Sequence, residues 1–78
     1  MSLVTHVAVF FAVNPDEELT AADIGAKFGV DPNNVGKTLR YAEEKGWVTI
    51  TRKPHPTRTK RTIRVYTPGS KLLKEIGR

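Results

Sequence analysis

Amide, basic and phenolic side chains recur along residues 31–45 at spacings that place them on the outer side of one helix. The set has five members: Asn33, Asn34, Lys37, Arg40 and Tyr41. Asparagine can form two hydrogen bonds with adenine and lysine can donate to guanine, so we expect Asn33, Asn34 and Lys37 to contact base edges. Arginine and tyrosine one turn further on suit contacts to phosphate oxygens. This pattern predicts recognition of double-stranded DNA rather than catalysis.

A second set of residues lies in the segment 52–64, which carries six basic residues and no acidic residue. They are Arg52, Lys53, Arg58, Lys60, Arg61 and Arg64. The rest of the chain has seven basic and eight acidic residues, so the net charge of +5 comes from this one segment. A local excess of positive charge favours an anionic partner at one edge of the protein. The alternative is a loop that only increases solubility.

The helix that must hold the first set is marked at both ends. Asp31 is a good N-cap, and Pro32 suits the first helical position because its missing N–H would be unpaired there. Gly46 can take the positive φ that ends a helix. An apolar stripe on the inner side is formed by Val35, Leu39 and Ala42. A helix of this form resembles a recognition helix, which enters the major groove with its first turns.

Gly36 interrupts this helix. Glycine inside a helix costs about 1 kcal/mol relative to alanine, so the position serves something other than helix stability. It indicates a close approach, either of another backbone or of the floor of a DNA groove. We therefore include Gly36 among the DNA-facing residues, since it would let the helix sit deeply.

A shorter helix is predicted to begin after Thr20 and to end at Gly29. Thr20 is a good N-cap, and Asp23 three residues later can complete a capping box. Gly25 inside this helix indicates that another helix approaches closely. Because the free N–H groups at a helix N-terminus attract phosphate, Thr20 joins the predicted DNA-binding residues.

The N-terminal residues 3–13 are apolar and rich in β-branched types, yet we predict a helix. Eleven residues exceed a typical strand, and Asn14-Pro15 is a clean stop. The apolar surplus of this helix, especially Phe10 and Phe11, indicates a possible surface for a homodimer.

The C-terminal half changes period. Alternating polar and apolar residues predict antiparallel strands at 47–52 and 61–67, joined by a basic loop at 53–60 that contains two prolines. In the second strand, one face carries Ile63 and Val65, and the other carries Arg64 and Tyr66. A last amphipathic helix can begin at Thr67-Pro68.

Length and composition exclude several classes of protein. Seventy-eight residues make one small domain, 1–78. With no cysteine and two isolated histidines, neither a disulfide nor a zinc site is expected. We expect no catalytic residue, no metal, no cofactor and no enzyme activity, because no nucleophile–base pair or glycine-rich phosphate loop is present. No apolar run could span a membrane and the start is a poor signal peptide, so the expected location is cytoplasmic and nucleoid-associated.

Residues 19–76 resemble the winged helix-turn-helix domain of MarR-type regulators. The helix-turn-helix spacing matches at Gly25, Gly29, Val30, Val35 and Leu39. The run 43–48 is similar to the end of the family's recognition helix and the start of its wing, and 66–69 is similar to its second-strand exit. The resemblance implies an α+β, mostly α fold: a three-helix core, a two-stranded β-hairpin wing and a C-terminal helix.

Together, the residue pattern and the resemblance predict a sequence-specific double-stranded DNA-binding protein that regulates transcription. The helix at 31–45 would lie in the major groove, and the basic wing at 52–64 on the backbone or in the minor groove. MarR-type proteins dimerise through long terminal helices, for which this chain has no room, so a homodimer would use its first helix, its last helix or a domain outside this sequence. No site for a small-molecule effector is evident. The alternatives are a protein-interaction winged helix and an accessory module for DNA replication or recombination.

Overall fold

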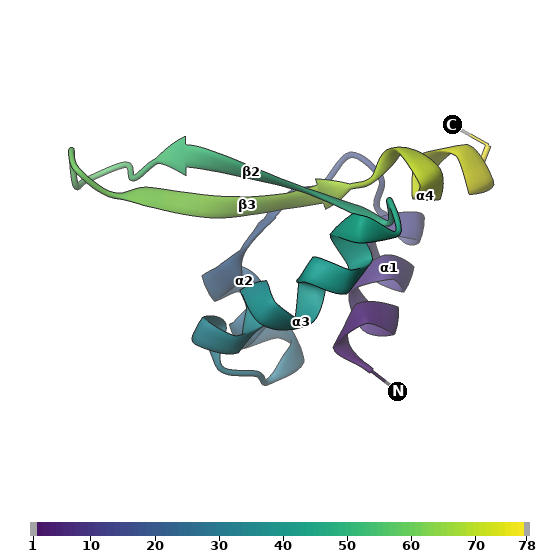
Figure 1. Cartoon of the computed structure of the whole chain (residues 1–78), viewed down its shortest axis with the longest axis horizontal. Helices are drawn as coiled ribbons and strands as arrows, with labels where there is room; N and C mark the ends of the chain where they lie inside the picture. Colours follow the sequence, from purple (N-terminus) through teal and green to yellow (C-terminus); the bar gives the residue numbers. More distant parts are fainter. Residues whose placement is uncertain (1, 78) are drawn as a thin grey trace.

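In the computed structural model, residues 2–77 are described, and they form four helices and one three-stranded antiparallel sheet (Figure 1). The elements in chain order are α1 (Leu3–Val13), β1 (Leu19–Thr20), α2 (Ala21–Phe28), α3 (Pro32–Glu44), β2 (Val48–Pro54), β3 (Thr62–Pro68) and α4 (Ser70–Glu75). The predicted fold class is confirmed. Among the described helices, none combines the length and the apolar character that a membrane crossing needs.

The helix ends follow from local hydrogen bonds. The Thr20 hydroxyl accepts the Asp23 N–H at 3.0 Å, and the Asp23 carboxylate accepts the Thr20 N–H at 3.0 Å, which completes the predicted capping box. The Asp31 carboxylate caps α3 by accepting the N–H two residues on at 2.9 Å. Gly29 and Gly46 follow α2 and α3 with φ of 70° and 77°, a region that other residues rarely adopt.

The turn between α2 and α3 is tightly packed around Gly25. A Cβ added to this residue would lie 2.8 Å from the Val30 carbonyl oxygen and 2.9 Å from Pro32 Cγ. The Val30 N–H also donates to the Gly25 carbonyl oxygen at 3.0 Å. The close approach predicted at Gly25 is therefore confirmed, although it involves the turn and the first residue of α3. This contact fixes the direction in which α3 leaves the turn.

The sheet has the strand order β1-β3-β2, so β3 is the central strand. The β2–β3 hairpin runs in register from Val48 opposite Pro68 to Pro54 opposite Thr62. On its other side, β3 pairs with β1, where Leu19 lies opposite Tyr66. The β2–β3 hairpin is the predicted two-stranded wing, and β1 is a third strand that the sequence did not indicate. Two residues are too few to show a periodicity, and their partners lie more than forty positions away in the chain.

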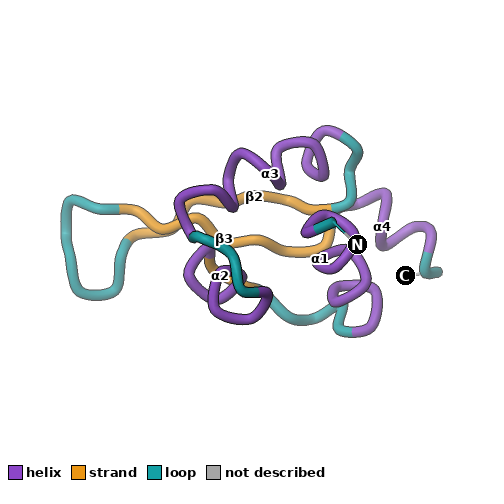
Figure 2. The backbone as a smooth tube through the Cα atoms, turned by 90° about the horizontal axis from the view of Figure 1, so that it is seen from below, coloured by secondary structure: helices purple, strands orange, loops and turns teal. Residues whose placement is uncertain are grey.

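The hairpin is longer than its sequence pattern indicated. β2 continues through Lys53 and Pro54, two residues that we predicted to lie in the loop. Proline is tolerated there because β2 is an edge strand of the sheet. β3 continues to Pro68, so α4 begins at Ser70 rather than at Thr67-Pro68. Figure 2 shows the hairpin tip extending well beyond the helices, and the molecule measures 38 × 24 × 20 Å.

The core lies between the helices and the sheet face that carries Tyr66. Its fully enclosed side chains come from α1, α2, α3 and β3: Val7, Phe11, Ile24, Val35, Leu39, Ala42 and Tyr66. Phe11 is buried and Phe10 is half-buried, so the proposal that both supply a dimer surface is wrong. The exposed apolar residues of α1 are instead Val9 and Val13.

Tyr66 is the largest enclosed side chain, and within residues 2–77 its hydroxyl has no partner at hydrogen-bond geometry, the Arg64 guanidinium being the polar group beside it. Burial raises the pKa of this hydroxyl above its usual value of 10.0, although the nearby Arg64 guanidinium offsets part of the rise. The predicted separation of Arg64 and Tyr66 from Ile63 and Val65 agrees with the strand register. The face that meets the core, however, is the one that holds Tyr66.

We expect Tyr66→Phe to change the unfolding free energy by no more than about 1 kcal/mol near neutral pH, because the hydroxyl that it removes has no partner at good hydrogen-bond geometry within residues 2–77. At high pH the two proteins should diverge. A raised folded-state pKa contributes stability that is present below the unfolded pKa and is lost as the pH rises through the folded pKa. Above about pH 10, urea titrations should therefore show a larger loss of unfolding free energy for the wild type than for Tyr66→Phe.

Exposed Tyr41→Phe is the matched control for this comparison, since it also removes one phenolic hydroxyl. Its stability should fall with pH as the wild type's does. Parallel pH profiles for the wild type and Tyr66→Phe would show that the buried hydroxyl does not contribute.

Candidate nucleic-acid interface

The N-terminal turns of α3 present free polar side chains. Asn33, Asn34, Lys37 and Arg40 are exposed, and their side chains make no hydrogen bond or ion pair within residues 2–77. The inner stripe of the same helix is fully buried, which fixes the outer side toward solvent. These four side chains are therefore available to an external partner, and they lie on a helix whose inner side is packed into the core.

Tyr41 has a structural partner at the other end of α3. Its ring packs edge-on against Trp47, with centroids 5.9 Å apart, and the Lys45 ammonium lies 5.4 Å from its centroid. The side chain is still 52% exposed. Tyr41 thus belongs to an aromatic contact near the end of α3, about two turns from Asn33 and Asn34.

Gly36 faces the sheet. A Cβ added there would collide with the Arg64 guanidinium, lying 3.3 Å from its Cζ, and would be 3.9 Å from the Tyr66 hydroxyl. Within the structure, the close approach that an interior glycine indicates is therefore made by a wing-strand side chain, and a contact of Gly36 with DNA stays a prediction. The interior glycine correctly indicated a close approach. Which group approaches depends on how the helix is rotated about its axis, and the sequence did not indicate that rotation.

Thr20 lies at the N-terminus of α2, and both its hydroxyl and its N–H take part in the capping box. The structure thus gives it a definite role in the fold. Lys53 is similarly engaged, because its ammonium forms a 3.2 Å ion pair with Glu18 on the connection before β1. That pair is about half exposed, so it contributes little to stability.

The wing tip carries the cations that project furthest. Arg58, Lys60 and Arg61 are exposed, and their side chains make no hydrogen bond or ion pair within the described residues. The tip is ordered by His55, whose Nδ1 accepts the N–H of Thr57 at 3.1 Å and of Arg58 at 3.2 Å. Sequence reasoning missed His55, because nothing in a lone histidine indicates that it accepts backbone hydrogen bonds.

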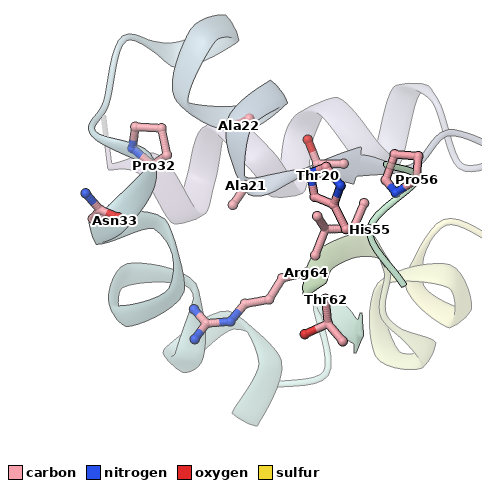
Figure 3. Close-up of a pocket in the computed structure, with 10 residues that line it drawn as sticks. Thr20, Ala21, Ala22, Pro32, Asn33, His55, Pro56, Thr62 and Arg64 are labelled. Atoms are coloured by element: carbon pink, nitrogen blue, oxygen red, sulfur yellow. The ribbon is translucent and has the colours of Figure 1, made fainter. Parts of the chain in front are cut away.

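Two hollows lie between the helices and the wing. The α2–wing hollow, about 590 Å³, is lined by Thr20, Ala21, Ala22, Pro32, Asn33, His55, Pro56, Thr62, Ile63 and Arg64 (Figure 3). The α3–sheet hollow, about 450 Å³, is lined by Asn33, Gly36, Lys37, Arg40, Glu43, Ile50, Arg52 and Arg64. Asn33 and Arg64 line both, so the two hollows adjoin each other at the first turn of α3 and the base of the wing.

Positive charge dominates this concave surface. The α3–sheet hollow brings together four cations from three elements and a single carboxylate, Glu43. Apart from the pair of Lys53 with Glu18, the cations of α3 and the wing form no ion pair within the chain as described. Among residues 2–77 no group of acidic, histidine or cysteine side chains could hold a metal ion. The α3–sheet hollow is therefore a mainly cationic surface.

A family model described as the MarR family matches residues 3–59, a stretch that holds α1 to α3 and β2 and stops in the wing tip. No curated protein and no solved structure gives a significant match. Members of the family are winged helix-turn-helix proteins that bind DNA and regulate transcription. Because the matched residues make up most of the chain, this protein belongs to the MarR family.

Proposed function

We propose that this protein binds double-stranded DNA in a sequence-dependent way, with α3 in the major groove and the β2–β3 wing on the phosphate backbone or in the adjacent minor groove. The observation that carries the proposal is the set of exposed amides and cations on α3 and the wing, which, apart from Lys53, form no ion pair within residues 2–77. Family regulators are typically not enzymes, which agrees with a binding role.

The side-chain types suggest which residues of this surface contact bases and which contact phosphates. Asn33, Asn34 and Lys37 lie on the turns of α3 that a major groove about 12 Å wide would admit first, so they are assigned to base edges. Arg40 and the wing cations are assigned to phosphates, which position the protein without reading sequence. This assignment predicts that specificity and salt-dependent affinity can be altered separately.

The first test uses Asn34→Ala and Lys37→Ala. Each should cost about 1 to 3 kcal/mol on a preferred duplex and relax the preference at a base pair, because a side-chain contact to a base edge is lost. Duplexes selected from a random pool and titrated by fluorescence anisotropy give both quantities. Lys74→Ala, an exposed lysine on α4, is the control and should leave both unchanged. Unaltered affinity and preference in both α3 variants would exclude the groove assignment.

The second test concerns the wing tip. Replacing Arg58, Lys60 and Arg61 with Ala should flatten the slope of log affinity against log salt by roughly 2 to 3 units, since each neutralised phosphate contributes about 0.9. Binding should weaken to a similar extent on all duplexes. The fold should be retained, because all three side chains are exposed. A triple variant that kept the slope, or that lost discrimination between sites instead, would contradict an electrostatic wing.

Two-fold action is a separate part of the proposal, since one helix-turn-helix reads few base pairs and dimers bind paired half-sites. Val9 and Val13 lie one turn apart on α1 and are 53% and 73% exposed. Beside Val9 is a groove of about 270 Å³ between α1 and α4.

Sedimentation should show a dimer, either free or on a palindromic duplex. The double substitution Val9→Asp with Val13→Asp should dissociate this dimer. Ala26→Asp on α2 is the control, and a wild-type monomer under both conditions would count against pairing.

A further inference from the structure

The α3–sheet hollow places like charges against one another. Arg52 and Arg64 lie directly opposite each other on β2 and β3, an arrangement that destabilises a sheet when the two charges are alike. Lys37 and Arg40 line the same hollow from α3. None of the four forms an ion pair with an acidic residue in the part of the chain that the structure describes. Repulsion among these cations would be relieved by one bound anion.

The position of Arg64 depends on the absence of a side chain at Gly36. The guanidinium occupies the space that a Cβ on α3 would take, with Cζ 3.3 Å from that position. Apart from Arg64, the nearest atom is the Tyr66 hydroxyl at 3.9 Å, an ordinary van der Waals distance. Glycine inside a helix is unfavourable relative to alanine, so its presence here is explained by the guanidinium that it admits.

Arg64 also has a central position on the binding surface. It is the cation that lines both hollows, and its side chain reaches from β3 toward α3 (Figure 3). A DNA strand that borders the major groove at α3 and then passes to the wing must cross this junction. A guanidinium offers five N–H donors in a planar fork that matches two phosphate oxygens.

We propose that the α3–sheet hollow binds one phosphate of the DNA backbone, that Arg64 is its central ligand, and that Gly36 is the positioning residue that leaves room for Arg64. The inference rests on the proposed function, because the phosphate belongs to a duplex already engaged by α3. It adds a phosphate contact at the base of the wing that is distinct from the contacts of the tip. Lys37, Arg40 and Arg52 surround the site and add to its positive potential.

The positioning role can be tested without DNA, through a double-mutant cycle of stability. In the Arg64→Ala background, Gly36→Ala should raise the urea midpoint, because helix propensity improves and the space is empty. In the wild-type background the same change must displace the guanidinium, so the midpoint should rise less or fall. Equal effects of Gly36→Ala in both backgrounds would overturn the positioning role.

The phosphate contact is tested by affinity for a mixed-sequence duplex over a range of salt concentrations. Arg64→Ala should weaken binding about tenfold or more at low salt, as expected for a hydrogen-bonded charge, and reduce the salt slope by about 0.9. Gly36→Ala should weaken binding in the wild-type background and have little effect when Arg64 is already absent. Arg64→Lys should keep most of the slope but lose affinity, since it retains the charge without the planar fork.

Two results would overturn this inference while leaving the proposed function intact. One is an unchanged slope for Arg64→Ala when the wing-tip triple variant still flattens it. The other is a loss of affinity for Gly36→Ala that is the same with and without Arg64, which would mean that Gly36 itself approaches the DNA. If neither the tip variant, Lys37→Ala nor Arg64→Ala altered binding to any duplex, the proposed function and the inference would both be wrong.

Discussion

The packing of β3 against α3 is the contact on which the rest of the structure depends. β3 is the central strand, so it ties the wing strand β2 on one side to β1 before α2 on the other. Tyr66 in the middle of β3 is fully enclosed, and it shares the core with Val35 and Leu39 of α3. One strand thus connects α3, the start of α2 and the wing. That arrangement suits a surface which must match a rigid duplex at several points, because little conformational freedom is lost on binding.

Local signals predicted the helices well because each depends on residues close together in the chain. Thr20 with Asp23, Asp31 with Pro32, and the positive-φ glycines after α2 and α3 act within a single turn. β1 was missed because its two residues become a strand only through pairing with Tyr66 and Val65. The ends of the hairpin were misjudged for the same reason, since the pairing of Pro54 with Thr62 and of Val48 with Pro68 extends both strands past their sequence pattern. Non-local pairing overrode local signals in each case.

The candidate site was predictable in its residue types but not in which of those residues have roles within the fold. Asn33, Asn34 and Lys37 have free side chains, and so do the three cations of the wing tip. Thr20 and Lys53, chosen on the same chemical grounds, already have partners in the chain. Gly36 shows the limit most clearly. A glycine inside a helix indicates a close approach, yet only the three-dimensional structure shows that the approaching group is the guanidinium of Arg64.

This distribution of partners has a consequence for how binding energy is divided. A side chain that already has a partner in the fold is ordered before binding, so it can fix where a contact with an external partner is made. A free amide on a helix keeps its donor and acceptor for hydrogen bonds that can differ from base to base. The first turns of α3 hold free amides on a rigid backbone, and the tip holds free cations on a long hairpin ordered by His55. Arg64 lies between them, charged like the tip and held against the helix like the core. The free amides of α3 and the free cations of the wing tip are thus joined along β3 by one cation, whose guanidinium packs against Gly36.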